Sequence, residues 1–193
     1  NAIREIAMRK QPGDFLLVTF GSQRQQPIAE AHPDMIVVES GIGYADTFAR
    51  YRIFESYAWM HYNYGREDKL AEAQPQDAVI PNYYDLDDYP FAPVKQHYAI
   101  HLGRVTIHKG LAQAIRACKA AGMPLAVAGQ QHVESPDYTY LGVLSIEDRA
   151  RLVGNAACLI APTQYIEPFG GVTCEAALYG TPVITTDWGA FSE

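Results

Sequence analysis

Two glutamates that flank a glycine pair are the residues best placed to do chemistry in this chain. Glu167 and Glu175 stand eight positions apart. Between them lie Gly170 and Gly171, and an apolar, helix-like stretch follows. Glycines at the start of a helix leave backbone N–H groups uncovered, and the positive end of the helix dipole attracts anions there. Two carboxylates beside such an anion site suit a ligand that carries both phosphates and many hydroxyl groups, and a nucleotide sugar is such a ligand.

A second segment supplies the positive charge that such a ligand needs. Gly103 and Arg104 follow an apolar run, and Lys109 and Gly110 open a helical pattern. Glycine lets the backbone approach a ligand, the arginine guanidinium matches phosphate oxygens as a planar fork, and lysine adds a compact charge. The segment is not a Walker A loop, because its lysine precedes the glycine and no Ser or Thr follows for magnesium. Taken alone, such cations and acids are typical of solvated loops and helix starts. The functional interpretation therefore depends on their meeting at one place.

Strands that alternate with helices are predicted for the carboxy-terminal half of the chain. The expected strands are 98–102, 125–128, 138–141, 158–161 and 183–186, and the expected helices are 109–121, 145–156 and 171–179. This alternation is typical of an α/β fold with a parallel, doubly wound sheet, in which ligands bind beyond the carboxyl ends of the strands. The loops 103–110 and 162–171 both leave strands at that edge, so we expect the two sets of candidate residues to meet there.

The amino-terminal half has a less regular pattern. We expect helices over 2–10, 27–31 and 45–57, the last of them aromatic, and strands over 15–20, 35–38 and 78–80. The segment 83–93 is rich in proline and aspartate and has neither a helical nor a strand period. Such a composition predicts an interdomain linker.

The composition excludes several classes of partner. The 193 residues carry 15 basic and 22 acidic side chains, for a net charge of -7, which argues against nucleic acid or an anionic membrane as the main partner. Three cysteines without a CxxC spacing predict free thiols in a reducing compartment and no zinc site. We find no apolar run near the ~20 residues of a membrane span and no signal peptide, so we expect a cytoplasmic protein.

Several of these segments together resemble the retaining glycosyltransferases of family 4. The resemblance rests on Gly103-Arg104…Lys109-Gly110, on Leu-Ala-Val-Ala-Gly at 125–129, and on Glu-Pro-Phe-Gly…Glu-Ala…Gly-Thr-Pro-Val at 167–183. Ile-Pro-Asn-Tyr-Tyr-Asp at 80–85 is similar to the interdomain signature of that family. Asp-Trp-Gly-Ala…Glu at 187–193 is similar to its Gly-Gly…Glu ending, with Ala190 in place of the second glycine. The resemblance covers residues 78–193, and its motifs occur in the family's order.

The resemblance implies the GT-B architecture, in which two Rossmann-like domains face each other. We therefore divide the chain into an acceptor-side domain at 1–80, a linker at 81–96 and a nucleotide-sugar-binding domain at 97–193. The family's first domain normally opens with a strand and a glycine-rich loop, which we do not find before Phe15, and its second domain should continue past Glu193. We therefore expect both domains to be incomplete and the chain to be a fragment of a longer protein.

The resemblance also implies roles for individual residues. Arg104 and Lys109 would hold the donor's diphosphate and neutralise the leaving group. Glu167 would bind hydroxyls of the transferred sugar, and Glu175 would bind the ribose hydroxyls. Backbone N–H groups from Phe169 to Gly171 would support the sugar or the phosphate. The activity implied is transfer of a hexosyl unit from a nucleoside-diphosphate sugar to a hydroxyl of a carbohydrate or lipid-linked acceptor. Configuration would be retained, no metal or bound cofactor would be needed, and a lipid-linked acceptor would bring peripheral contact with a membrane.

Three further features carry weaker signals. Gly43 belongs to a Gly-x-Gly between a strand and a helix, but the third glycine of a dinucleotide motif and its later acid are missing. A loop on the acceptor side of the cleft is therefore favoured. His61 lies in an aromatic run that more often packs in a core, with an acceptor-side role as the alternative. Asp85 and Asp87 form the Asp-x-Asp pair that metal-dependent glycosyltransferases of another architecture use. An acidic, solvated turn is favoured here, because the two cations of the 103–110 loop already supply a metal's charge.

Two other functions stay open. A chain that lacks parts of both domains would be a non-catalytic fragment or subunit that binds a nucleotide sugar without turning it over. A nucleotide-sugar 2-epimerase has the same architecture, but it needs further acid or base groups that we do not identify. We find no convincing covalent nucleophile, so for a transferase we expect front-face attack assisted by the leaving phosphate.

Overall fold

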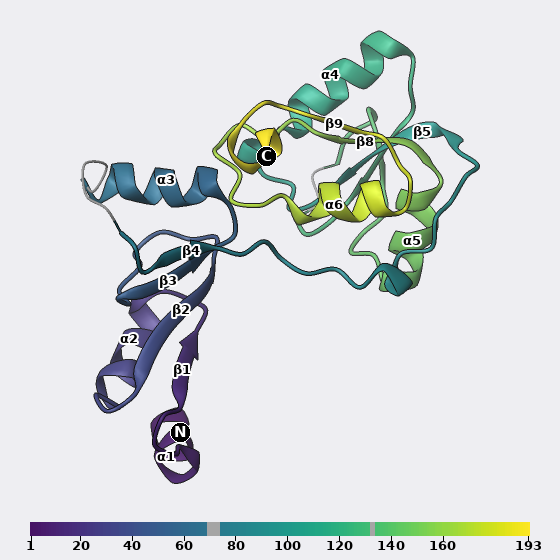
Figure 1. Ribbon diagram of the computed structural model, residues 1–193. Helices are drawn as coiled ribbons and strands as arrows, with labels where there is room; N and C mark the ends of the chain where they lie inside the picture. The colour runs from purple at the N-terminus through teal and green to yellow at the C-terminus, as the bar shows by residue number, and fades with distance from the viewer. Residues whose placement is uncertain (69–73, 132–133) are drawn as a thin grey trace. The chain divides into compact units, whose positions relative to one another are not determined.

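The computed structural model of the chain describes residues 1–68, 74–131 and 134–193. These residues divide into two compact units, one formed by residues 1–82 with Glu193 and the other by residues 83–192 (Figure 1). Each unit contains a parallel sheet with helices packed on it. The prediction of an α/β chain with two parallel sheets is therefore confirmed.

The first unit builds a four-stranded parallel sheet. Its strands lie in the order β1 (Phe15–Val18), β2 (Ile36–Ile42), β3 (Tyr51–Phe54) and β4 (Asp77–Val79). Its helices are α1 (Ala2–Arg9), α2 (Ser22–Glu30) and α3 (Tyr57–Arg66). Alternate residues of β1 point to one face, where Leu16 and Val18 pack with Ala29 of α2 in a small buried core. Helix α2 begins five residues earlier than predicted and carries Pro27 inside it.

The prediction of an aromatic helix over residues 45–57 is wrong. Residues 51–54 form β3, which pairs with both β2 and β4, and α3 begins only at Tyr57. Side chains along β3 alternate between accessible and buried, as a strand requires. Ser56 starts the helix, because its Oγ accepts a hydrogen bond from the N–H of Trp59 at 3.1 Å. Pairing with two neighbouring strands therefore makes residues 51–54 a strand, although their sequence pattern suggests a helix.

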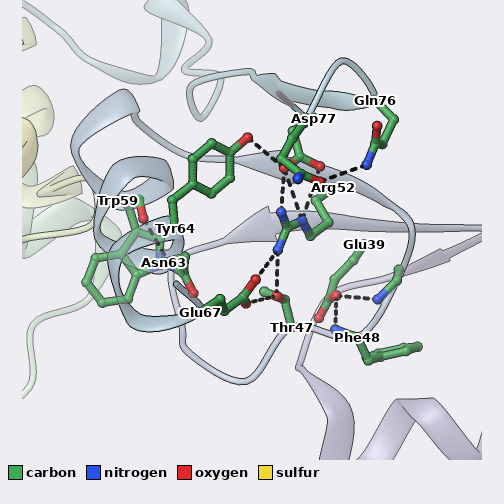
Figure 2. A network of polar contacts seen from close by, with 12 residues as sticks. Glu39, Thr47, Phe48, Arg52, Trp59, Asn63, Tyr64, Glu67, Gln76 and Asp77 are labelled. Carbon is green, nitrogen blue, oxygen red and sulfur yellow. Dashed lines mark hydrogen bonds and ion pairs between the residues drawn. The ribbon is translucent and has the colours of Figure 1, made fainter. Parts of the chain in front are cut away.

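A buried network of charged side chains ties the first unit together (Figure 2). Arg52 on β3 is only 4% exposed. Its guanidinium donates to Asp77 on β4 at 2.6 Å and to Glu67, directly after α3, at 2.9 Å. The Tyr64 hydroxyl donates to the same Asp77 at 2.8 Å, and burial raises the pKa of Tyr64 to about 12. Buried charges are tolerated only when they are paired and hydrogen-bonded, so this network fixes α3 against the two strands.

The second unit builds a five-stranded parallel sheet in the order β7-β6-β5-β8-β9. Its strands are β5 (Gln96–Leu102), β6 (Leu125–Ala128), β7 (Thr139–Tyr140), β8 (Ala156–Ala161) and β9 (Val183–Thr185), and its α-helices are α4 (Leu111–Ala121), α5 (Ile146–Gly154) and α6 (Gly171–Leu178). Helix α4 covers one face, where Ala114 packs with Val127. Helices α5 and α6 cover the other face, where Val153 and Ala176 pack with Leu159 (Figure 1). Because both faces are covered, β6 and β8 are apolar along their whole length, and β5 between them is buried from Ala99 to Leu102.

The helix boundaries follow from local chemistry. Ser145 caps the start of α5 as predicted, since its Oγ accepts a hydrogen bond from the N–H of Asp148 at 3.0 Å. Helix α4 begins two residues later than predicted, because Ile107–Lys109 form a separate 3-10 turn, η2, and Gly110 follows with a φ of 76°. A Cβ on Gly110 would overlap the carbonyl oxygen of Pro162. Glycine at this position therefore lets two loops come into contact.

The segment predicted as a linker packs on the second unit from residue 83 onward. The backbone N–H of Ala92 donates to the carbonyl oxygen of Tyr179 at 3.0 Å. The Lys95 ammonium donates to the carbonyl oxygen of Gly154, the last residue of α5, at 2.5 Å and to the Thr181 hydroxyl at 3.0 Å. A cation at the negative end of a helix is favourable, so Lys95 anchors this segment even though burial lowers its pKa.

Candidate functional site

The two candidate loops meet at the carboxyl edge of the second sheet. Strand β5 leads into the loop 103–110, and β8 leads into the loop 162–171. The backbone N–H of Gln164 donates to the carbonyl oxygen of His108 at 2.7 Å. The structure therefore brings together the cationic and the acidic loop, as expected for neighbouring strands of a parallel sheet.

An ion pair joins the two loops. The Lys109 ammonium lies 2.9 Å from Oε2 of Glu167, whose side chain is only 9% exposed. The same ammonium lies 4.9 Å from the ring centroid of Tyr165. Burial by itself lowers the pKa of Lys109, but hydrogen bonds with Tyr165 and Glu167 outweigh burial and raise it above its ordinary value. The pair thus places one permanent cation and one carboxylate side by side at the end of the sheet.

The backbone of Glu167 is held by the last turn of the second unit. In η3 (Gly189–Ser192), the N–H of Ala190 donates to the carbonyl oxygen of Glu167 at 2.9 Å. Gly189 has a φ of 63°, and a Cβ there would overlap the same carbonyl group. The Thr186 hydroxyl donates to the carbonyl oxygen of Thr163 at 2.8 Å. These contacts fix the acidic loop before any ligand arrives.

The glycine pair stands at the start of α6, as predicted. Gly170 has a φ of 81° at the N-cap position, and being glycine it has no side chain to cap the helix. A Cβ on Gly170 would overlap the ring of Phe191, and one on Gly171 would lie 2.7 Å from the Tyr84 hydroxyl. Phe169 stacks on the ring of Tyr84 with a centroid distance of 6.3 Å. Phe191 and Tyr84 therefore pack closely against the backbone at this helix start, and only glycine fits at positions 170 and 171 without a shift of these rings.

Glu175 on α6 pairs with Arg149 on α5, a residue that the sequence analysis missed. Nη1 of Arg149 donates to both carboxylate oxygens of Glu175, at 3.0 and 2.8 Å. The side chains are 35% and 15% exposed. An arginine inside a charged helical segment is ordinary in a sequence, and only the packing of α5 beside α6 on one sheet face makes it a partner of Glu175. The cap at Ser145 predicts where α5 begins and therefore on which face of the helix Arg149 lies. It does not predict which element packs against that face.

Arg104 and Gly103 follow β5 directly. Arg104 is exposed to solvent, so its guanidinium is accessible to a ligand. Gly103 has a φ of 145°, and its N–H donates to the carbonyl oxygen of Ala128 at 2.9 Å. A Cβ on Gly129 would overlap the carbonyl oxygen of Gly103. Glycine at position 129 therefore allows the close approach of the ends of β5 and β6, whereas at position 103 it is the positive φ that favours glycine.

Gly43 and His61 belong to the first unit, whereas the residues above belong to the second. Gly43 follows β2 and donates its N–H to the carbonyl oxygen of Gly41 at 3.0 Å. His61 is exposed on α3, with its ring 6.4 Å from each of the rings of Tyr57 and Tyr64. The aromatic run is thus only partly core, since Trp59 is the buried aromatic residue of α3.

Neither a cluster of metal-binding side chains nor a membrane-spanning helix is found among the residues that the structure describes. Among residues 1–68, 74–131 and 134–193, no three His, Cys, Asp or Glu side chains gather as a metal site would require. Asp85 and Asp87 form a local turn instead, in which Oδ1 of Asp85 accepts a hydrogen bond from the N–H of Asp87 at 3.1 Å. Within the same ranges, no helix has the length and apolar character needed to cross a bilayer.

Two parallel α/β units in sequence, with a cationic and an acidic loop at one sheet edge, define a protein of the two-domain GT-B class. The chain belongs to the group 1 glycosyltransferase family, because the family described as "Glycosyl transferases group 1" matches residues 87–193. That match begins before β5 and includes every candidate residue of the second unit.

Individual relatives agree with this assignment. A glycogen synthase of Mycobacterium tuberculosis is 29% identical in an alignment of 136 residues that covers 60% of this chain and 33% of the relative. The fold is similar to that of AviGT4, a glycosyltransferase of avilamycin A biosynthesis, with a TM-score of 0.74 and 22% identity over 98% of this chain and 61% of that one. It is also similar to Anabaena HepE in complex with UDP-glucose, with a TM-score of 0.73 and 18% identity over 91% of this chain and 61% of that one. The chain therefore spans one third to three fifths of the length of these relatives.

Proposed function

We propose that the protein to which this chain belongs transfers a hexosyl unit from a nucleoside-diphosphate sugar to an acceptor hydroxyl, with retention of anomeric configuration. The observation that carries the proposal is the Lys109–Glu167 ion pair at the same sheet edge as the glycine start of α6. A cation and an uncapped helix start suit a diphosphate, and a carboxylate suits sugar hydroxyls. Membership of the family supports the reaction class, and the UDP-glucose complex of HepE makes uracil the base to test first.

The cationic loop would act on the leaving group. Cleavage of the bond between sugar and diphosphate develops negative charge on the phosphate oxygens, and fixed cations aimed at that charge lower the barrier. Removal of one such group typically costs ~3 kcal/mol in the transition state. We assign this role to Arg104 and Lys109, whose charges would do the work of a metal ion. The raised pKa of Lys109 supports the assignment, because the ammonium then stays charged at neutral pH.

The acidic loop would bind hydroxyl groups. Glu167 is paired with a cation and lies 3.5 Å from the Thr163 hydroxyl, and a carboxylate engaged in this way is a weaker nucleophile. We therefore assign Glu167 to hydroxyls of the transferred sugar, and attack by the acceptor to the same face that the diphosphate leaves. Glu175 would take the ribose hydroxyls, and the N–H groups of Phe169 to Gly171 the sugar or the phosphate.

The first unit would supply the acceptor side. We keep the division into an acceptor-side domain at 1–80, a linker at 81–96 and a donor domain at 97–193 as part of the proposal. Gly43 and His61 are the residues that we assign to a carbohydrate or lipid-linked acceptor.

Calorimetric titration of the chain with UDP, GDP and ADP tests the donor site. We expect one nucleotide to bind with micromolar affinity and the Lys109→Ala and Glu175→Ala variants to lose that binding. Lys119→Ala is the matched control, because Lys119 lies on α4 and pairs with Asp137 through an exposed side chain. If the Lys109 and Lys119 variants bind equally well, the assignment of the cationic loop fails.

A second candidate follows from the short span of the chain. It covers 33% of the glycogen synthase and 61% of AviGT4, so a part that binds nucleotide sugar without turnover is the alternative. Binding without product formation across a screen of acceptors favours this alternative. An epimerase of the same architecture would instead give a new nucleotide sugar without any acceptor, which product analysis detects.

A further inference from the structure

We propose that Arg149 is a positioning residue, which fixes the carboxylate of Glu175 so that it accepts two hydrogen bonds from the vicinal hydroxyls of the donor's ribose. This inference rests on the proposed function, because it takes the ribose assignment of Glu175 from there. The new element is the arginine, which comes from a different helix and would act through Glu175.

The geometry of the pair leaves the carboxylate able to accept. Nη1 of Arg149 bonds to both oxygens of Glu175, at 3.0 and 2.8 Å. An ionised carboxylate offers about four lone-pair sites, so one donor nitrogen shared between the oxygens leaves a free site on each of them. Two hydroxyls on adjacent carbons can donate to two such sites at once. The Glu175 side chain is 15% exposed, so it is not sealed from solvent.

The pair is not arranged for maximal stability. The strongest arginine–carboxylate geometry is a fork in which two nitrogens each bond one oxygen. Here a single nitrogen serves both oxygens, while Nε of Arg149 is buried without a hydrogen-bond partner among the described residues. Buried polar groups are almost always paired. Here Nε of Arg149 stays unpaired within the described part of the chain, while the side chain fixes the orientation of Glu175. Such an arrangement is typical of a site that holds a ligand group.

The surroundings show why the carboxylate needs a positioning partner. The rings of Tyr89 and Tyr179 lie with their centroids 5.2 Å apart. Burial, followed by the negative charge of Glu175, raises the pKa of both tyrosines, and the backbone N–H of Tyr179 donates to the carbonyl oxygen of Glu175 at 3.1 Å. In this mostly aromatic setting, Arg149 supplies the fixed charge that keeps Glu175 in one orientation.

A comparison of ribose and deoxyribose ligands tests the role. We would measure by calorimetry the Kd of the nucleoside diphosphate that the chain binds and of its 2′,3′-dideoxy analogue, for the chain and for Arg149→Met. We expect Arg149→Met to bind the ribonucleotide ~10-fold more weakly, because Glu175 loses one charged hydrogen-bond partner. We expect it to bind the dideoxy analogue with unchanged affinity. Arg149→Lys should restore most of the ribonucleotide affinity, because one nitrogen makes the contact.

Two controls separate this role from a structural one. Arg151→Met, two residues along α5 at an exposed pair with Asp148, should change neither Kd. In a Glu175→Gln background, Arg149→Met should have no further effect, since coupled residues are not additive. Equal weakening of both ligands, without rescue by lysine, would overturn the role of Arg149 alone. Failure of the chain itself to bind any nucleotide would instead overturn the donor assignment and this role together.

Discussion

The ammonium of Lys109 lies 2.9 Å from the carboxylate of Glu167, although 58 residues separate the two in the chain. The pair forms where β5 and β8 end side by side, and it exists before any ligand binds. Under the proposed function, a diphosphate that approaches Lys109 would share it with Glu167, whose negative charge would repel the phosphate. The pair would then balance the binding of the sugar hydroxyls against the binding of the diphosphate.

The Glu167→Gln variant separates these two effects. We expect turnover to fall ~100-fold, because an amide replaces the charged acceptor of the sugar hydroxyls. We expect UDP alone to bind several-fold more tightly, since the repelling charge is removed. Steady-state kinetics and calorimetry on the same protein measure the two quantities. Glu147→Gln, an exposed glutamate on α5, serves as control, and full turnover by Glu167→Gln would refute the role.

The pH dependence of stability should report on His101. This residue is buried at the end of β5, its Nδ1–H donates to the carbonyl oxygen of Ile160 at 2.9 Å, and Nε2 has no partner among the described residues. Burial lowers its pKa below the ordinary 6.5. The unfolded chain therefore binds a proton more readily than the folded chain does. The stabilisation is complete above pH 6.5 and is lost as the pH falls from 6.5 toward the lowered value.

Urea unfolding between pH 7.5 and pH 5 measures this effect. We expect His101→Gln to lose less stability over the interval than the unaltered chain, because glutamine can donate to the same carbonyl but does not titrate. His97→Gln, at an exposed position of the same strand, should keep the original dependence. If the unfolding free energy depends on pH in the same way in all three proteins, protonation of His101 does not affect stability.

Replacement of Gly170 should destabilise the start of α6. Alanine there meets two penalties, the positive φ of 81° and an overlap with the ring of Phe191. Gly122→Ala is the matched control, because Gly122 has a φ of 62° with open space around its Cβ position. We expect the control to lose about 1–2 kcal/mol of unfolding free energy and Gly170→Ala to lose a further ~1–3 kcal/mol. If both variants lose the same unfolding free energy in urea titrations, the Phe191 ring moves aside without lowering stability.

The buried network of the first unit gives a prediction independent of function. Arg52→Met leaves Asp77, which is 1% exposed, without its guanidinium partner. Removal of one partner of a buried pair typically costs ~3–5 kcal/mol, and we expect a loss of that size in thermal or urea unfolding. Arg9→Met, which breaks an exposed pair with Glu5, should change stability little. A small effect of Arg52→Met would show that water reaches Asp77.

Features fixed by neighbouring residues were predictable from the sequence. Ser145 followed by an acid gave the start of α5, and the glycines at 170–171 gave the start of α6. The strand–helix alternation placed the loops of Lys109 and Glu167 at one edge, since parallel strands with helical connections all end on the same side. The family motifs lie in these local patterns, and for that reason the family could be identified before the fold was known.

Features that depend on distant partners required the tertiary structure. Tyr51-Arg-Ile-Phe becomes a strand because β2 and β4 pair with it and Asp77 neutralises Arg52. Arg149 becomes a partner of Glu175 because α5 and α6 pack on the same sheet face. The sequence by itself determined which segments carry charge and where helices begin, because caps and periodicity act over a few residues. The tertiary structure decided which charges meet, because an ion pair depends on a distance in space that sequence spacing does not set.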